Sequence, residues 1–406
     1  MLPVDLPGTV RDALLAPLVD HHCHGVRRDD LGRAQFELLI TEGGAPAPPG
    51  TTHFDTPFGA AVRRWCAPLL DLEPHAPPAV YLARRSELGP AEANTRLLRG
   101  AGVVAFLVDT AQDTAQDTAQ YTAQDTARDG DAHGGRHHGG DALTAAEMGR
   151  LGGAAADEIV RIERIEQDVA ETAQIAVDYL DGVAAELSAR AARAVGLKTA
   201  IACRAGLGFD PARPSRGAVI AAANRRLADP KQPLADEVLL RHLLWSAVDV
   251  ARERGLPLQV HAGAVDVPLG PHLADPARLA GFVRALRPLG VPVILLHCYP
   301  YHRQAAYLAG LHPHVYVDVG LALPHTAAAA ARVMDELLEL APFHKLLFSS
   351  HCRGVAESAY LGALYYRHAL ARALGARLTL GEWSTADAAR IAHMIGSGNA
   401  RRVYRL

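Results

Sequence analysis

Hydrophobic and polar positions along this chain form a repeating pattern, in which short apolar runs alternate with longer stretches of helical periodicity. Short apolar runs bounded by turn residues are typical of buried strands. We expect strands at 18–24, 103–109, 197–203, 258–261, 291–297, 315–319 and 346–350, with a weaker one at 35–40. The helical stretches lie at 57–72, 145–187, 236–254, 276–289, 302–309, 327–340 and 358–374.

This alternation predicts an α/β fold with a parallel sheet. Nearly eight strand–helix units, with polar residues at the strand ends, favour a (β/α)8 TIM barrel with a metal site at the C-terminal ends of its strands. An open, doubly wound sheet is the alternative. It is disfavoured because no GxGxxG follows a strand, and because one metal could not easily reach so many strand ends of an open sheet. We expect residues 1–406 to form one domain.

One segment does not fit the barrel pattern. From Asp109 the chain runs DTAQDTAQDTAQYTAQDTARDGDAHGGRHHGGD, a four-residue repeat followed by a Gly- and His-rich stretch. The repeat has no apolar stripe, and Thr and Asp are poor interior helix residues. We therefore expect 110–141 to be a disordered surface insertion after the third expected strand. Its histidines could bind metal adventitiously.

Composition narrows the function. The 406 residues carry 41 basic and 44 acidic side chains and a formal charge of −3, which argues against nucleic acid or a membrane as partner. No run is long enough to cross a bilayer, and no signal peptide is recognisable. The five cysteines lack a CxxC pair, so we expect reduced thiols and a cytoplasmic location.

Histidines end several of the expected strands. His22 and His24 are two residues apart, and alternate residues of a strand point to the same side, so one ion could take both imidazoles. His261 and His297 end two later runs, and His351 follows a third. A zinc-like ion with three such ligands keeps a position for water, which it makes nucleophilic near neutral pH. The alternative is that these histidines are satisfied core residues.

Several stretches resemble the amidohydrolase superfamily, in particular the branch that includes the amidohydrolase-like domain associated with glutamine synthetase-like proteins. The matching stretches are VDHHCHG (19–25), FELLITEGG (36–44), EIVRIE (158–163), GLKTAIACRAGL (196–207), LQVHAG (258–263), VILLHCYPYHRQAAYLAG (293–310), HVYVDVGLALPH (314–325) and KLLFSSHCRG (345–354). The resemblance implies a barrel, a divalent metal (Zn, with Mn or Fe as alternatives) and hydrolysis of an amide or related C–N bond. It also implies that His22, His24 and His261 are metal ligands, and that His297 either ligates the metal or stabilises the transition state.

One departure from the family concerns the catalytic base. The family places an aspartate after the eighth strand, where this chain has His351. Imidazole can also accept a proton, with an ordinary pKa of about 6.5. Hydrolysis could therefore survive with His297 and His351 as catalytic residues. The alternatives are a metal-dependent decarboxylase or other lyase, and a non-catalytic protein. Asp318 and Glu357 are the nearest carboxylates that could substitute.

The remaining site candidates concern a small-molecule substrate. Arg204 could bind a substrate carboxylate, and Lys198 could do so or form a core salt bridge or, once carbamylated, bridge two metals. Tyr299 and His302 follow the expected sixth strand and could contact substrate over the barrel mouth. The family resemblance suggests a carboxylate-bearing amide, and a homodimer is a further expectation.

Overall fold

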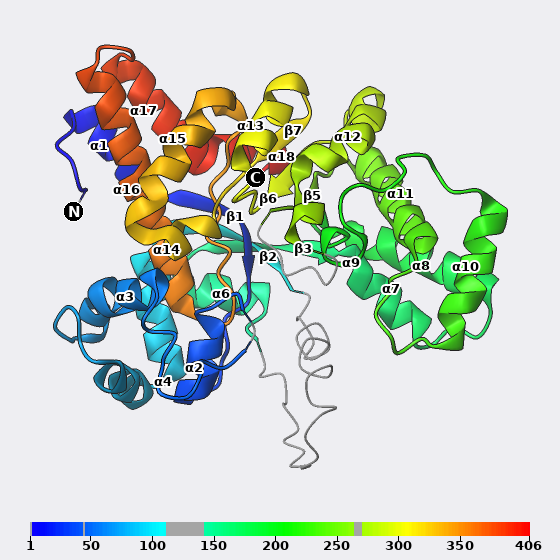
Figure 1. Cartoon of the computed structure of the whole chain (residues 1–406), viewed down its shortest axis with the longest axis horizontal. Helices are drawn as coiled ribbons and strands as arrows, with labels where there is room; N and C mark the ends of the chain where they lie inside the picture. The colour runs from blue at the N-terminus through cyan, green and yellow to red at the C-terminus, as the bar shows by residue number, and fades with distance from the viewer. Residues whose placement is uncertain (1, 44, 111–141, 264–269) are drawn as a thin grey trace.

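The structure is a computed structural model, and it describes residues 2–43, 45–110, 142–263 and 270–406. Its centre is a parallel sheet whose strand order follows the chain (Figure 1). The strands are β1 (Leu18–His24), β2 (Val103–Asp109), β3 (Ala155–Arg161), β4 (Gly196–Thr199), β5 (Leu258–His261), β6 (Val293–Leu296) and β7 (Val315–Val317). The α/β class and the parallel sheet are thus confirmed.

A segment after β7 joins the two edges of this sheet. Leu347 donates its backbone N–H to Val317 O on β7 (3.1 Å), and His21 on β1 donates its N–H to Phe348 O (3.1 Å). The segment thus lies between β7 and β1, where an eighth barrel strand would be. It forms a single β-bridge with β7 and is not a regular strand. A regular strand at 346–350 was therefore predicted wrongly, although the segment lies where that strand was expected.

Helices surround this sheet. They are α1 (Gly8–Leu15), α2 (Arg33–Leu39), α3 (Pro57–Ala61), α4 (Pro78–Gly100), α6 (Ala145–Gly152), α7 (Ile162–Ala170), α8 (Ala176–Ala191), α9 (Ala202–Ala205), α10 (Arg216–Ala228), α11 (Glu237–Arg254), α12 (Ala280–Leu286), α13 (His302–Leu311), α14 (Ala322–Thr326), α15 (Ala330–Leu340), α16 (Ala356–Thr379), α17 (Thr385–His393) and α18 (Asn399–Tyr404). In Figure 1, α8, α10 and α11 stand together on one side, and α1, α16 and α17 on the other.

Two further sequence predictions of elements are wrong. The stretch 35–40 is helical, as part of α2, so the insertion that begins after Asp109 follows the second strand and not the third. The long helix expected at 145–187 is divided into α6, β3, α7 and α8. Gly153 ends α6 in a left-handed conformation (φ 66°), which a glycine adopts readily, and the chain then pairs with β2 and β4 as β3. Most of the expected insertion, 111–141, lies outside the described residues.

Inward-facing side chains fill the space enclosed by the sheet. They alternate along the strands, as at Ala105 and Leu107 on β2 or Ile294 and Leu296 on β6, and they form a cluster separate from the main core. Tyr404 and its neighbours on α18 belong to the same cluster. The polar site described below continues these inward rows toward the C-terminal ends of the strands. Among the described helices, none is both long and apolar enough to cross a membrane.

Candidate metal centre

The end of β1 brings two histidines to one place. The rings of His22 and His24 are 5.1 Å apart between centroids, as the spacing predicted. A register shift between Asp20 and Cys23 interrupts the regular pairing with β2. Such irregularities re-aim side chains, and here His21 also faces inward, with Nδ1 3.0 Å from the Tyr404 hydroxyl.

Three histidines from distant parts of the chain converge on one point. They are His22 on β1, His297 after β6 and His351, which follows the segment that joins β7 to β1 (the closing segment). Their ligand atoms all lie within 4.8 Å of one another. The ring centroids of His297 and His351 are 4.1 Å apart, and those of His22 and His297 are 5.2 Å apart. We call these three residues the histidine cluster.

The backbone at two of these histidines is unusual. His297 and His351 have φ values of 64° and 48°, in the left-handed region that non-glycine residues seldom occupy. Such conformations cost about 1–3 kcal/mol and persist where surrounding contacts enforce them. Their presence at both strand ends points to a functional site.

The histidine cluster has buried polar atoms without partners. Within the described part of the chain, both ring nitrogens of His297, Nδ1 of His22 and Nδ1 of His351 have no hydrogen-bond partner. Burial lowers the pKa of all three imidazoles well below its usual value, and neighbouring positive groups lower it further. The rings are therefore neutral at pH 7, and neutral imidazole is the form that binds metal. This donor set fits a divalent transition ion such as zinc.

Two further predicted ligands flank the histidine cluster. The His24 ring lies 5.1 Å from that of His351, and the His261 ring lies 4.8 Å from that of His297. Neither belongs to the tight set of three, in which His351 stands instead. Their assignment as ligands remains a prediction. Asp266, which could orient a ligand in the loop after β5, lies outside the described residues.

Charged side chains meet beside the histidine cluster. The buried Lys198 on β4 places Nζ 3.0 Å from Asp109 Oδ2 and 3.1 Å from His22 Nε2. Arg161 Nη2 lies 2.7 Å from the same Asp109 oxygen. Burial raises the pKa of Asp109, but Arg161 and then Lys198 outweigh it and bring it to about 2. We call Asp109, Arg161 and Lys198 the charged corner.

Sequence reasoning missed Asp109 and placed Arg161 on a helix. Both are the last residues of strands, β2 and β3, whose earlier inward residues lie in the barrel interior. Continuing the alternation from Ala105 and Leu107 gives Asp109, and continuing it from Ile159 gives Arg161. The alternation of inward and outward residues therefore indicates Asp109 and Arg161 as site residues, just as it indicates the histidines.

Glu163 and Arg204 lie near the charged corner. Glu163 is buried and accepts hydrogen bonds from the Thr199 hydroxyl (2.5 Å) and the Ala200 N–H (2.9 Å). Burial raises the pKa of Glu163. Arg204 on α9 is half-buried and donates to Leu234 O at 3.3 Å. Its contact with a substrate carboxylate remains a prediction.

In the loop after β6, Tyr299 and His302 contact each other and a neighbouring helix. Tyr299 is half-buried and stacks on His302, with centroids 5.5 Å apart. His302 Nε2 lies 2.9 Å from Glu336 Oε2 on α15, so this ring nitrogen links two helices. Both residues as substrate contacts remain predictions.

Neither carboxylate considered as a substitute base joins the histidine cluster. Glu357 on α16 accepts from the Tyr81 hydroxyl (2.8 Å) and from Arg85 Nε (2.9 Å). Asp318 uses both of its oxygens behind the histidine cluster, as detailed below. The cysteines beside the site direct their thiols to backbone carbonyls: Cys23 to Leu107 O, Cys298 to Leu295 O and Cys352 to Val355 O. Burial raises the pKa of all three thiols.

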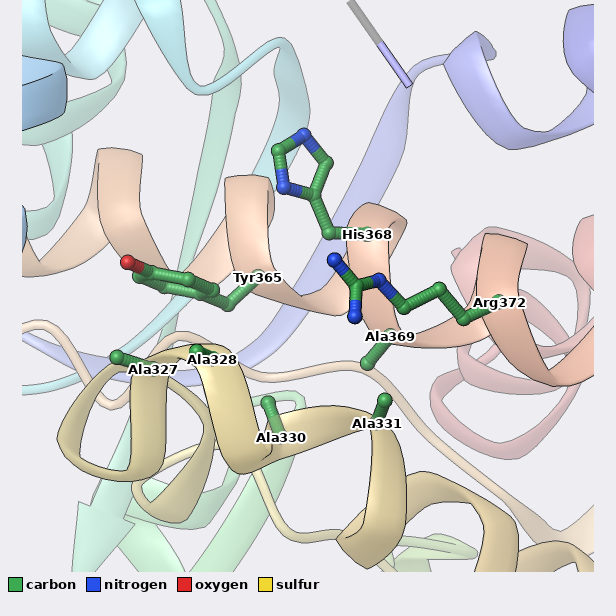
Figure 2. Close-up of a pocket in the computed structure, with 8 residues that line it drawn as sticks. All are labelled: Ala327, Ala328, Ala330, Ala331, Tyr365, His368, Ala369 and Arg372. Atoms are coloured by element: carbon green, nitrogen blue, oxygen red, sulfur yellow. The ribbon is translucent and has the colours of Figure 1, made fainter. Parts of the chain in front are cut away.

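Away from the histidine cluster, a small pocket lies between α16 and the segment that leads into α15. Figure 2 shows Tyr365, His368 and Arg372 on α16, with the alanines of this segment lying across from the helix. The other lining residues are Ala327, Ala328, Ala330, Ala331 and Ala369. No site histidine lines the pocket, so it is distinct from the candidate metal centre.

Comparisons with solved structures support the fold. A protein from Lactobacillus casei, provisionally named a metal-dependent hydrolase, is 22% identical with a TM-score of 0.77, over 99% of this chain and 98% of that one. A uronate isomerase from Bacillus halodurans is 11% identical with a TM-score of 0.63, over 98% and 95% of the two chains. At these identities the likeness shows the fold alone.

Sequence comparisons give the family. Protein fluG from Emericella nidulans is 28% identical over 223 residues, which are 52% of this chain and only 26% of that protein. A family model described as Amidohydrolase matches residues 19–406, which include the whole histidine cluster and the charged corner. This chain belongs to the amidohydrolase family.

Proposed function

We propose that the chain is a metal-dependent hydrolase that cleaves an amide or a related C–N bond of a small, carboxylate-bearing substrate. One observation carries the proposal: three buried, neutral imidazoles with unpartnered nitrogens converge at strand ends in an amidohydrolase chain. A divalent cation, with zinc as first candidate, supplies Lewis-acid activation of water and of the scissile carbonyl when bound.

The protein's own residues have separate roles in this proposal. His22 and His297 would hold the cation, with His24 and His261 beside them. His351 stands where the family has an aspartate and accepts the proton of the attacking water. Its lowered pKa keeps the imidazole neutral at pH 7, as a proton acceptor requires.

The charged corner would bind and orient the substrate. Two cations, Arg161 and Lys198, share one carboxylate, Asp109, so the corner keeps a net positive charge. A substrate carboxylate is complementary to that charge, and Arg204 lies close enough to influence the ionisation of Glu163 beside it. Water exclusion by the buried barrel interior strengthens these interactions.

A metal-dependent decarboxylase or other lyase is the second candidate. It is favoured by the ligand set of the histidine cluster, which in the described part of the chain contains no carboxylate to serve as base. A lyase would release carbon dioxide or another carbon fragment, whereas the hydrolase would release an amine or ammonia.

The test uses the full chain loaded with Zn²⁺ and a panel of N-acyl and γ-glutamyl amino acids and amides. Release of amine that is lost in His351→Gln and kept in the exposed control His393→Gln supports the hydrolase. Carbon dioxide release without amine contradicts it in favour of the lyase. Ligand binding without any turnover contradicts both.

A further inference from the structure

Two buried carboxylates lie behind the histidine cluster. Asp20 on β1 and Asp318 after β7 are both fully buried. Neither is in the charged corner, and no arginine or lysine among the described residues forms an ion pair with either of them. Their oxygens instead accept hydrogen bonds from the loops that carry the site histidines.

Asp318 holds the loop that carries His297. Its Oδ1 accepts the backbone N–H of His297 (2.9 Å) and that of Gly320 (3.2 Å). Its Oδ2 accepts from His21 Nε2 (2.7 Å) and from the Ser349 hydroxyl (2.9 Å). A Cβ on Gly320 would overlap Ser349, so only glycine permits this close approach.

Asp20 holds the loop that carries His351. Its Oδ1 accepts the backbone N–H of Ser350 (2.9 Å), and its Oδ2 accepts the Ser350 hydroxyl (2.5 Å). The same hydroxyl oxygen accepts the backbone N–H of Cys352 at 3.0 Å. Residues on both sides of His351 are thereby fixed to β1.

Asp318 and Asp20 both fix the backbone that carries a site histidine. Each binds the backbone at or beside a histidine in the left-handed region, His297 or His351, where an unconstrained chain would relax. The direction of each imidazole follows from this backbone, because the side chain leaves from a fixed Cα. An acceptor-only group is required at Asp318, since all four of its contacts are donors.

We propose that Asp318 and Asp20 are positioning residues: Asp318 sets the imidazole of His297 as a ligand of the divalent cation, and Asp20 sets that of His351 as the proton acceptor beside it. The inference rests on the proposed metal-dependent function and deepens it. Neither residue touches the cation in this account. They act through the backbone, as outer partners of ligands do in metal sites, where their loss weakens metal affinity about 10–100-fold.

The test compares neutralising variants of equally buried carboxylates. Asp318→Asn and Asp20→Asn are measured beside Glu166→Gln, which removes a buried charge that pairs with Arg226 and Tyr179 away from the histidine cluster. Zn²⁺ affinity is determined by competition with a chromophoric chelator, the ligand field by Co²⁺ absorption, and stability by thermal unfolding.

We expect Asp318→Asn to weaken Zn²⁺ binding about 10–100-fold and to change the Co²⁺ spectrum. Glu166→Gln should lower the unfolding temperature and leave both metal readouts unchanged. If Asp318→Asn does not fold, Ser349→Ala removes one contact of the same carboxylate and should give a smaller loss of affinity.

Three results would overturn the inference. Equal Zn²⁺ affinity in wild type, Asp318→Asn and Ser349→Ala overturns it alone, because the proposed function survives. Equal loss in Glu166→Gln and Asp318→Asn overturns it by showing a general effect of destabilisation. A wild-type chain that binds no Zn²⁺ contradicts the proposed function itself and removes the inference with it.

Discussion

The two halves of the candidate site differ in how their polar groups are satisfied. In the histidine cluster, buried nitrogens of His22, His297 and His351 lack hydrogen-bond partners among the residues that the structure describes. In the charged corner, Asp109 is paired with both Arg161 and Lys198. The halves meet where Lys198 Nζ approaches His22 Nε2 at 3.1 Å.

This difference separates two functions of a buried polar site. Unpartnered buried polar groups are costly, and protein interiors rarely retain them without a ligand that satisfies them. Paired charges are already compensated and can orient a substrate without taking up a cation of their own. The comparison assigns cation binding to the histidine cluster and substrate orientation to the charged corner.

Removing a histidine should have the largest effect. We expect His297→Asn to weaken Zn²⁺ affinity at least about a hundredfold, since it removes a proposed ligand while asparagine tolerates the left-handed backbone. Affinity is measured by chelator competition, with the exposed His393→Asn as matched control. Undiminished affinity in His297→Asn would break the assignment of the cation to this half.

Acid should destabilise the two halves in different pH ranges in the metal-free protein. The pKa values of His22, His297 and His351 are lowered on folding, so the unfolded chain binds more protons below about pH 6.5. The free energy of unfolding should fall as pH drops below that value, by up to about 1.4 kcal/mol per pH unit for each histidine. Urea unfolding at pH 7.5, 6.0 and 5.0 in chelator measures this.

The charged corner should respond only at lower pH. The pKa of Asp109 is about 2, below its unfolded value, so its stabilising contribution is present above about pH 4 and is lost as pH falls toward 2. In the histidine cluster, His297→Asn should make the free energy of unfolding depend less on pH between pH 6.5 and 5, because one histidine with a lowered pKa is removed. An unchanged slope in that variant would contradict the account of the histidine cluster.

Neutralising the lysine of the charged corner should weaken substrate binding and lower protein stability, and it should leave metal affinity unchanged. Lys198→Met removes the lysine partner of Asp109 and leaves its ion pair with Arg161, and we expect a loss of about 1–3 kcal/mol in stability. KM for the carboxylate-bearing substrate should rise about tenfold, because the substrate loses one charge-assisted hydrogen bond. The exposed Lys231→Met is the control. A loss of bound metal in Lys198→Met would show that the halves are not separate.

Restoring the family's carboxylate should have the smallest effect. His351→Asp adds a negative charge beside the cation, and we expect Zn²⁺ to bind about tenfold more tightly. Aspartate tolerates the left-handed backbone at this position (φ 48°). His351→Asn has a similar shape without the charge and should show no such gain. Equal affinities in the two variants would remove charge as the explanation.

The sequence predicted those parts of the fold that depend on local pattern. Strands 18–24, 103–109 and 258–261 match β1, β2 and β5 because each is a short apolar run with a clear end. β3 was missed because Ala155–Arg161 is polar and partly exposed along its first half, so no apolar run marks it. The closing segment around Leu347 is set by contacts with two distant strands, which no local pattern reveals.

The site was predictable where residues end apolar strands. His22, His24, His261 and His297 were found in this way, and the structure brings their rings into one region. The roles of Asp20 and Asp318 depend on backbone contacts across the barrel, which sequence alone does not show. Their recognition required the positive φ values at the histidines that they hold.

Metal content per chain tests the central claim most directly. We would measure it by elemental mass spectrometry on the untagged full chain, on His297→Asn, and on a variant that lacks 111–141, which removes His133, His137 and His138. The account predicts about one equivalent of a transition ion, retained without 111–141 and lost in His297→Asn. A chain that remains metal-free after incubation with Zn²⁺ or Mn²⁺, or metal that disappears with 111–141, would contradict it.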